Sequence, residues 1–391
     1  MDDSLILDAP IETPAFVYSI PALLERAARL KRLSNSSSIL SLYTTKACSL
    51  LDVVARLAVE LDGLSVSSCF EAQWAREAAG PDSLVQYVNP LLKDTEHERI
   101  LELCDRVTVN SLSQLERFRE VIATTSELGI RINPQLSWVD DPRYDPCRNQ
   151  SKLGVPVKQL RDLTDRDPAA LSHVAGLHFH SNCDSGVISE WVRTLHHVES
   201  TLGDTMRRFR WINIGGGYTS QDDQAMVSLV SECLRISQKY DLQVVIEPGA
   251  DLVRPAGFLV ATVNDLIECD STSVAVLDTT VGHWPEVFEY QFEPNVIGER
   301  EGAPYTYILA GSSCLAGDVF GMYSFDQPLA VGARIVFENA GAYSIVKAHM
   351  FNGINLPSIY VLTELGELVL RKEFTYEDFA SRWGVDTHHL I

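Results

Sequence analysis

The sequence lacks the paired cysteines and the cysteine–histidine spacings that mark zinc sites and disulfide-rich scaffolds. Its eight cysteines lie singly along 391 residues, and no two of them form a CxxC pair. A structural zinc site needs thiolates or imidazoles at short, regular spacings, and a disulfide scaffold needs many cysteines in a short chain. We therefore expect no metal site, reduced thiols and a cytoplasmic protein.

Basic residues are scarce relative to acidic ones. The chain has 32 Lys and Arg against 53 Asp and Glu, which gives a formal net charge of −21. Such a charge argues against nucleic acid or an anionic membrane as a partner, and it is compatible with a cationic ligand. Acidity that merely aids solubility explains the same numbers, so charge alone does not decide between these interpretations.

The sequence also lacks a long apolar run and a basic segment before a short apolar one. We therefore expect neither a membrane span nor a signal peptide. The hydrophobic content of 46% is ordinary for a protein with a sizeable core. A chain of 391 residues can form two domains, or one large barrel with an appendage.

Short apolar strands alternate with helical segments through the first two thirds of the chain. Helical stretches are predicted, for example, at residues 20–33, 70–79, 189–202 and 223–240. We predict strands at residues 38–45, 62–67, 84–88, 106–110, 129–133, 174–180, 210–215 and 242–247. Eight strand-then-helix units predict an α/β fold with a parallel (β/α)8 TIM barrel.

The pattern changes at about residue 256, where strands begin to follow one another without long helices. The predicted strands are residues 257–264, 273–280, 305–311, 333–338, 358–362 and 367–370, with a first strand at 15–18. We therefore predict a barrel domain over residues 36–255. Residues 1–35 and 256–391 would form a β-rich, sandwich-like or barrel-like domain that the N-terminal strand completes.

Lys46 directly follows the first predicted barrel strand and precedes a helical stretch at residues 50–57. Reactive groups in a TIM barrel come from the C-terminal ends of the strands, so Lys46 is expected at the barrel mouth. Burial of an amine there would favour its neutral form and make it a Schiff-base nucleophile. Most lysines at strand ends are solvated instead, so Lys46 alone leaves both interpretations open.

Polar residues and glycines gather at the ends of the other predicted barrel strands. They are Ser67, Ser68, Glu71, Asn89, Asn110, Ser111, Asn133, His178, His180, Gly215, Gly216, Gly217, Glu247 and Gly249. Asparagine and serine often cap the helix that follows, which explains part of the set. Capping does not explain Lys46, His180 and Glu247 together.

The loops after the seventh and eighth predicted strands carry Gly215-Gly216-Gly217 and Glu247-Pro248-Gly249. These loops commonly build a phosphate site, because glycine lets backbone N–H groups approach an anion. A lysine, a phosphate cradle and a carboxylate at one mouth indicate pyridoxal 5′-phosphate (PLP). Lys46 would form the Schiff base, and Glu247 would keep the pyridine nitrogen protonated. His180 would stack on the ring, unless it is a core histidine bonded to backbone.

Several longer motifs extend this pattern over nearly the whole chain. They lie at residues 110–118, 131–134, 145–148, 152–154, 176–183 and 247–249, with Cys314-Leu315-Ala316-Gly317-Asp318 and Phe351-Asn352-Gly353-Ile354 the most specific. In these motifs the chain resembles the fold-type III PLP decarboxylases, the alanine-racemase-like class that includes ornithine and diaminopimelate decarboxylases. Within that class it is most similar to carboxynorspermidine (carboxyspermidine) decarboxylase.

The resemblance implies a homodimer with shared active sites, in which the β-rich domain contributes to the interface. Cys314 would protonate the substrate carbon after CO2 leaves, and Asp318 would face the amines of the substrate from the neighbouring subunit. Asp278 resembles a second acidic position contributed across the dimer, and Tyr343 resembles a tyrosine that hydrogen-bonds the phosphate. Cys314 as a buried thiol and Tyr343 as a core residue remain alternatives.

Two positions depart from the wider class. Ala250 stands where many relatives have arginine, and Cys183 stands where the class has serine. The resemblance implies that both changes belong to the carboxynorspermidine branch. Backbone groups would then hold more of the phosphate.

The expected function is decarboxylation of carboxynorspermidine or carboxyspermidine to norspermidine or spermidine, a step of polyamine biosynthesis. One alternative is the decarboxylation of a related diamino acid, such as diaminopimelate, or of an amino-acid conjugate. Another is a non-catalytic barrel protein that carries PLP. Cys314 and the β-rich domain argue against such a carrier, which needs neither.

Overall fold

The computed structural model describes residues 4–7, 9–34, 36–217, 219, 222–270 and 272–385. The chain forms two compact units, one of Met1–Leu23 with Leu252–Ile391 and the other of Leu24–Asp251. We call them the β domain and the barrel. None of the described helices is long and apolar enough to cross a membrane.

The barrel is a closed ring of eight parallel strands. They are β2 (Ile39–Thr44), β3 (Gly63–Val66), β4 (Leu84–Val88), β5 (Arg106–Val109), β6 (Glu127–Asn133), β8 (Gly176–His178), β9 (Trp211–Asn213) and β10 (Gln243–Ile246). Pairing of β10 with β2 and of β5 with β6 closes the ring. The short strand β7 (Val155–Pro156) pairs with β6 outside this ring.

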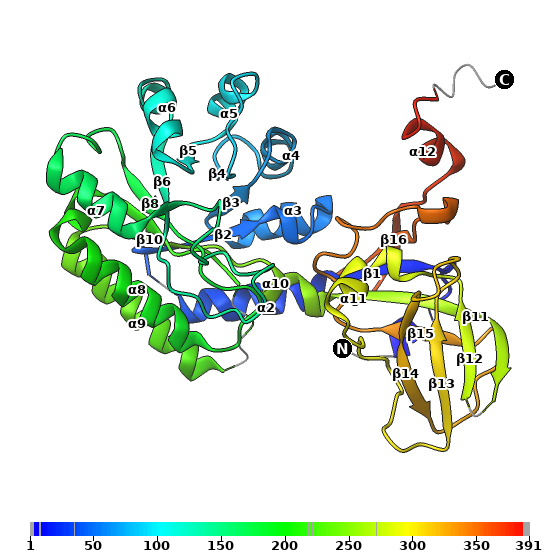
Figure 1. The fold of residues 1–391 in the computed structure, drawn as a ribbon. Helices are drawn as coiled ribbons and strands as arrows, with labels where there is room; N and C mark the ends of the chain where they lie inside the picture. The colour runs from blue at the N-terminus through cyan, green and yellow to red at the C-terminus, as the bar shows by residue number, and fades with distance from the viewer. Residues whose placement is uncertain are drawn as a thin grey trace. The chain divides into compact units, whose positions relative to one another are not determined.

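Helices lie around the strands as an outer layer (Figure 1). They are α3 (Leu51–Glu60), α4 (Cys69–Ala79), α5 (His97–Leu103), α6 (Leu112–Thr125), α7 (Val157–Arg166), α8 (Ile188–Leu202) and α9 (Asp223–Tyr240). Ser68 caps α4 by accepting from the Glu71 N–H at 3.1 Å, and Ser111 caps α6 by accepting from the Gln114 N–H at 3.2 Å. Capping therefore accounts for these two serines at strand ends.

Trp211 fills the barrel interior, and two glycines make room for it. A Cβ on Gly176 would lie 2.1 Å from the Trp211 ring, and one on Gly129 would lie 2.4 Å from it. The Arg106 guanidinium stacks over the same indole at 5.1 Å from the ring centroid. The interior is thus packed with side chains, so the chemistry of the barrel is confined to its ends.

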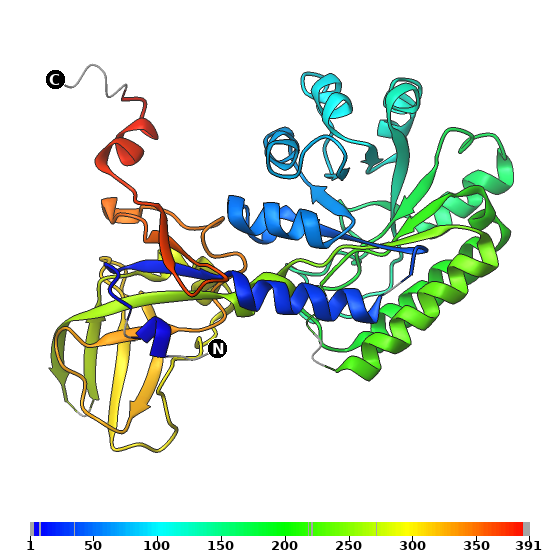
Figure 2. The same ribbon diagram turned by 180° about the vertical axis from the view of Figure 1, so that it is seen from behind.

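The β domain is one curved sheet assembled from both ends of the chain. Its order is β14 (Val319–Phe325), β13 (Tyr305–Ala310), β12 (Thr272–Leu277), β11 (Gly257–Cys269), β1 (Ala15–Ser19), β16 (Ser358–Leu362) and β17 (Leu368–Lys372). β15 (Arg334–Phe337) pairs with β11 off this path. β1 runs antiparallel to β11 and parallel to β16, and Figure 2 shows it between them.

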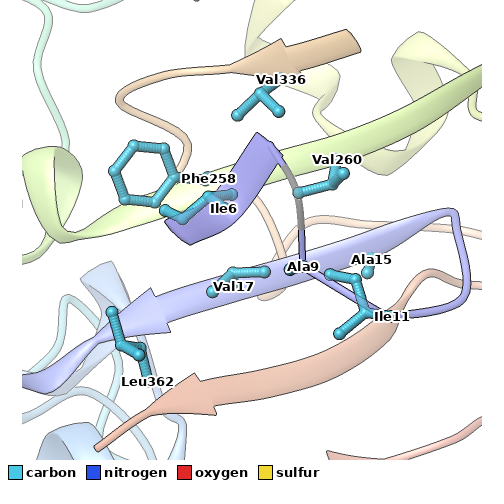
Figure 3. Close-up of a cluster of buried hydrophobic side chains, with 9 residues drawn as sticks. All are labelled: Ile6, Ala9, Ile11, Ala15, Val17, Phe258, Val260, Val336 and Leu362. Carbon is cyan, nitrogen blue, oxygen red and sulfur yellow. The ribbon is translucent and has the colours of Figure 1, made fainter. Parts of the chain in front are cut away.

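A buried apolar cluster holds the N-terminal segment in the β domain (Figure 3). It consists of Ile6, Ala9, Ile11, Ala15, Val17, Phe258, Val260, Val336 and Leu362. Ile6 comes from the helix α1 (Ser4–Leu7), Ala9 and Ile11 lie between α1 and β1, and the others come from β1 and from strands more than 200 residues later in the chain. Burial of their apolar surface therefore makes the N-terminal segment part of the domain core.

The fold class predicted from the sequence is confirmed, including all eight barrel strands and the N-terminal strand of the β domain. The prediction missed the strand β14, which directly follows Asp318. It also missed the short helices α1, α11 (Pro285–Tyr290) and α12 (Tyr376–Ser381). Helices this short carry too little periodicity to be recognised in a sequence.

Candidate active site

A cavity of about 380 Å³ opens at the C-terminal ends of the barrel strands. We call it the barrel cavity. Its lining includes Lys46, Ser65, Arg131, His178, His180, Cys183 and Glu247, with Arg143, Tyr144 and Asp145 from the loop after β6. Three of the residues singled out in the sequence, Lys46, His180 and Glu247, therefore meet in one place.

Lys46 lies in the short 3-10 turn Thr45–Ala47 that follows β2. Its neighbours Thr45 and Ala47 are buried, whereas Lys46 itself is exposed. The turn is held by the Thr45 hydroxyl, which lies 3.0 Å from Glu71 Oε2 and 3.2 Å from the Ser65 carbonyl oxygen. The expected burial of the amine is thus wrong for this chain, because the side chain extends into the open mouth of the cavity.

Glu247 follows β10 and is only 6% exposed. Its Oε1 accepts hydrogen bonds from Ser65 Oγ and from Asn213 Nδ2, both at 2.8 Å. Burial works against the charged form, but the charge of Lys46 and the hydrogen bond from Asn213 favour it, and the pKa of Glu247 is held well below its usual range. The barrel thus presents a fixed, ionised carboxylate.

Two further buried polar residues line the barrel cavity. Burial, and then the nearby charges of Arg131 and Lys46, lower the pKa of His178, which is 1% exposed. Arg131 on β6 is 8% exposed, and burial lowers its pKa to about 10, still high enough to keep the guanidinium charged. Neither residue has a predicted role from the sequence, although a charged residue between Ile130 and Ile132 in a buried strand is a usable signal.

The three glycines after β9 are forced by close backbone approach. Gly215 and Gly217 have φ values of +74° and +92°, and a Cβ on Gly216 would lie 1.9 Å from the Glu247 carbonyl oxygen. The Gly215 N–H donates to Asn213 Oδ1 at 2.8 Å, and the Gly216 N–H donates to His180 Nδ1 at 3.2 Å. Both N–H groups thus have acceptors within the barrel, and the phosphate contact expected of these glycines stays a prediction.

His180 therefore has a backbone partner, as the core-histidine alternative expected, while its ring also lines the barrel cavity. Its Nδ1 accepts a hydrogen bond, so the neutral ring carries its proton on Nε2. Burial, with the charges of Lys46 and Arg131, lowers the pKa of His180 to about 3. At Gly249 a Cβ would meet Ala47 and Thr44 only at ordinary contact distances of 3.4 and 3.6 Å, so packing does not require that glycine.

Both acidic residues expected to face the substrate are bonded within the β domain. Asp278 Oδ2 accepts from Thr13 Oγ1 at 2.6 Å, and its Oδ1 accepts from the Thr262 N–H at 2.9 Å. Asp318 is 3% exposed, and its two oxygens accept from the Val281 and Ser313 N–H groups at 2.8 and 2.9 Å. These bonds show a structural use for each carboxylate.

Cys314 and Tyr343 also lie in the β domain. Cys314 is exposed, and its N–H donates to Asn352 Oδ1 at 3.1 Å, which ties the two most specific sequence motifs together. Tyr343 is half-buried with a φ of +55°, a conformation that costs a bulky residue about 1–2 kcal/mol. Because Cys314 is exposed, the alternative that it is a buried thiol is wrong.

A second cavity, of about 360 Å³, lies in the β domain beside Cys314. We call it the β-domain cavity. Ser313 and Leu315, which flank Cys314, line it together with Phe288, Glu289, Lys347 and Phe351. Lys347 Nζ lies 2.5 Å from Glu289 Oε2 and 3.5 Å from Glu286 Oε1. This cavity was not predicted from the sequence, because Glu289 lies in the unpredicted helix α11.

Comparison with known proteins decides the family. The family described as pyridoxal-dependent decarboxylase, pyridoxal binding domain, matches residues 22–254. This chain belongs to the pyridoxal-dependent decarboxylases. It is an enzyme, and its cofactor is PLP.

Several relatives share nearly the full length of the chain. Carboxyaminopropylagmatine decarboxylase of Synechocystis sp. is 35% identical, over 96% of this chain and 96% of its own. Carboxynorspermidine/carboxyspermidine decarboxylase of Campylobacter jejuni is 30% identical, over 95% of this chain and 98% of its own. The crystal structure of carboxynorspermidine decarboxylase from Campylobacter jejuni, complexed with norspermidine, has a TM-score of 0.86 and 29% identity, over 95% of this chain and 100% of that one.

The residues of the barrel cavity fit PLP. A reachable amine at Lys46 faces an ionised carboxylate at Glu247, which is the donor set that an aldehyde and a pyridinium ring require. The buried nitrogens of His178 and Nε of Arg131 have no hydrogen-bond partner among the described residues. These groups leave polar capacity inside the cavity for a charged aromatic ligand.

Proposed function

We propose that this decarboxylase removes the α-carboxylate of an amino acid that carries a long cationic tail. The substrate class is a carboxylated polyamine or aminopropyl conjugate: carboxynorspermidine, carboxyspermidine or carboxyaminopropylagmatine. The main structural support for this proposal is that Lys46 and the ionised Glu247 line the same cavity. The names of relatives that are 35% and 30% identical over nearly the full length support the substrate class. Such a reaction belongs to polyamine biosynthesis, and a cytoplasmic location remains a prediction.

PLP, when bound, takes up the electron pair that remains on the substrate after CO2 leaves. Lys46 would bind the cofactor covalently until the substrate amine replaces it. Glu247 would hold a proton on the ring nitrogen, and its firm attachment to Ser65 and Asn213 supports that role. His180 would pack against the ring.

The phosphate would bind near Gly215, Gly216, Gly217 and Gly249, with Tyr343 as a further donor. Because the Gly215 and Gly216 N–H groups already have acceptors, we propose that these two glycines shape the loop. Gly217 and Gly249 would then approach the phosphate with their backbone. The left-handed backbone of Tyr343 supports a functional reason for its placement.

We further propose a homodimer with shared active sites. The β-rich part of the chain, predicted from the sequence as residues 1–35 and 256–391, would contribute to the dimer interface, and the predicted PLP-binding barrel is residues 36–255. Support comes from exposed apolar side chains around Cys314: Phe288, Leu315, Val319, Met322 and Phe351 are each 38–57% exposed. Cys314 of the partner subunit would return a proton from Sγ to the Cα that lost CO2.

The β-domain cavity is our candidate for the distal cation of the substrate. Its walls combine the Glu289 carboxylate, whose side chain is 40% exposed, with Phe288 and Phe351, which are 47% and 49% exposed. A carboxylate beside aromatic faces suits an ammonium or a guanidinium group. Lys347 pairs with Glu289 Oε2 at 2.5 Å, so the cation of the substrate would compete with Lys347 for this carboxylate. Glu289 lines the cavity with a side chain that is 40% exposed, whereas Asp318 is 3% exposed, and we therefore give Glu289 the role that the resemblance gave to Asp278 and Asp318.

The decisive experiment is CO2 release from a panel of substrates. We expect turnover of carboxynorspermidine, carboxyspermidine or carboxyaminopropylagmatine, with little or none of lysine, ornithine and diaminopimelate. Efficient turnover of diaminopimelate without turnover of any tailed substrate would contradict the proposal. The proposal would also be contradicted if the protein binds PLP but releases CO2 from none of the substrates in the panel.

Mixed dimers test the shared site. Lys46→Ala and Cys314→Ala proteins should each be nearly inactive, whereas random reassortment at equal amounts should restore roughly a quarter of wild-type activity by symmetry counting. The measurement is activity after joint refolding, or of a heterodimer purified through two tags. A verified heterodimer without recovered activity would contradict sharing.

A further inference from the structure

His178 is a buried histidine without a hydrogen-bond partner. It ends β8, is 1% exposed and lines the barrel cavity together with Lys46 and Glu247. Neither of its ring nitrogens has a partner among the residues that the structure describes. An imidazole removed from water without replacement bonds destabilises a fold, so a simple core role accounts poorly for it.

The two oxygens of Glu247 are not equivalent. Oε1 accepts from Ser65 Oγ and Asn213 Nδ2, both at 2.8 Å. Oε2 instead faces His178 Nε2 at 3.7 Å, which is a close electrostatic contact but too long for a hydrogen bond. A small rotation of the imidazole would close this gap, and Oε2 is the oxygen that remains for a further partner.

The charges around His178 keep its ring neutral. Arg131 and Lys46 are cations of the same cavity, and together with burial they outweigh the attraction of Glu247, so the pKa of His178 is lowered. A neutral imidazole has one N–H, and it donates toward a carboxylate when that proton is on Nε2. His180 differs, because its Nδ1 already accepts from the Gly216 N–H.

We propose that His178 is a positioning residue that acts on the cofactor ring through Glu247. In the loaded enzyme its Nε2–H donates to Oε2 of Glu247, so that three donors hold the carboxylate and keep Oε2 turned toward the ring nitrogen. This inference rests on the proposed role of Glu247. It gives the first of the two strand-end histidines a task separate from that of His180.

Three variants test this role. His178→Phe keeps an aromatic ring but has no donor, and His178→Gln offers an amide N–H at a similar reach. His197→Phe is the matched control, because His197 lies on α8 and bonds the Pro134 carbonyl oxygen at 3.1 Å, away from the cavity. Thermal unfolding shows whether each variant folds, and His178→Leu replaces the Phe variant if the larger ring does not fit.

We expect His178→Phe to lower kcat roughly 10- to 100-fold with little change in KM, as for the loss of a charge-assisted hydrogen bond. The absorption band of bound PLP should shift in the same direction as in Glu247→Gln. His178→Gln should recover most of the loss, and the His197 control should match the wild type. Wild-type kcat and an unshifted band in His178→Phe would overturn the proposal.

A double-mutant cycle with Glu247→Gln gives the sharpest test. If His178 acts through Glu247, the Phe variant should cost less than about threefold in the Glu247→Gln background. An equal loss in both backgrounds would overturn the proposal, because His178 would then act on its own.

Nitrogen NMR of wild-type protein with labelled histidine provides a measurement that needs no turnover. Loading PLP should move the His178 Nε2 resonance to that of a hydrogen-bonded N–H, and Glu247→Gln should abolish the change. An unmoved resonance would overturn the proposal. Failure of wild-type turnover with this resonance shift intact would instead contradict the proposed function alone.

Discussion

The barrel and the β domain use their carboxylates in opposite ways. In the barrel, Glu247 is buried among side-chain donors, and its pKa is held well below the usual range. In the β domain, burial raises the pKa of Asp278, and its oxygens accept from Thr13 and the Thr262 backbone. A carboxylate prepared for chemistry thus keeps its charge and one available oxygen, whereas both oxygens of a structural carboxylate accept hydrogen bonds within its own domain.

The two regions also differ in how complete they are. The barrel brings Lys46, His178, His180 and Glu247 around one cavity from its own strands. The β domain instead exposes Cys314 and two aromatic side chains, Phe288 and Phe351, at the edge of its cavity. Exposed apolar side chains of this kind mark surfaces that bind another protein surface, so this edge of the β domain needs a partner to complete it.

The largest expected effect is at Lys46. Lys46→Ala should reduce kcat by at least about 1,000-fold, because the variant loses the only amine proposed to bind the cofactor covalently. Borohydride reduction followed by mass spectrometry should place the adduct of the wild-type protein on Lys46. An adduct on another lysine would show that the barrel cavity is not the cofactor site.

Glu247→Gln should lower kcat by roughly 100- to 1,000-fold, because a neutral amide cannot hold the ring nitrogen protonated. PLP should still bind, since its phosphate and its link to Lys46 are untouched. Equilibrium dialysis and steady-state kinetics separate these two effects. Near-normal turnover of Glu247→Gln would mean that Glu247 is a structural carboxylate, as Asp278 is.

A pair of variants in the β domain separates substrate recognition from structure. Glu289→Gln should raise KM for the tailed substrate by roughly 10- to 100-fold with little change in kcat, because a charged contact is lost. Asp278→Asn should leave KM unchanged, since an amide can accept from the Thr262 N–H and donate to Thr13. If steady-state kinetics instead show a raised KM for Asp278→Asn and an unchanged KM for Glu289→Gln, Asp278 and not Glu289 binds the substrate.

Asp318→Asn should lower the free energy of unfolding by roughly 1–3 kcal/mol, because an amide N–H would face one of two buried backbone donors. Asp326→Asn is the control, since its partner Arg300 is exposed and such pairs contribute about 0–1 kcal/mol. Denaturant titration of both proteins measures the difference. Unchanged stability with a raised KM would mean that Asp318 serves the substrate.

The smallest expected effect is the pH dependence of Asp278. Because its folded pKa is raised above the ordinary value of 3.8, the folded protein binds more protons than the unfolded chain in the window above that value. Stability relative to Asp278→Asn should therefore fall as the pH rises through this window. Unfolding titrations at a series of pH values measure the slope, and a relative rise would place Asp278 among the charge-stabilised carboxylates.

Much of the barrel could be predicted from the sequence, because its strands are buried on both faces and read as short apolar runs. Lys46, His180 and Glu247 could be found because each ends such a strand, and strand ends of a closed parallel barrel must meet. The strand β14 and the helix α11 could not be predicted from the sequence. No turn residue separates β14 from the Cys314–Asp318 motif, and α11 spans only six residues. Because α11 was not predicted, Glu289 and the β-domain cavity were not predicted either.

The sequence by itself determined the order of strands, the two-part organisation and the residues that reach the barrel mouth, since periodicity and strand ends are local properties of a chain. Only the tertiary structure decided which polar groups have partners. Asp278 accepts a hydrogen bond from Thr13 and Asp318 accepts one from the Val281 N–H, both far away in sequence, whereas His178 is buried beside Glu247 without a hydrogen bond. Whether a buried polar group has a hydrogen-bond partner depends on the distance in space between segments that are far apart in the sequence. The spacing of residues along the chain does not give that distance.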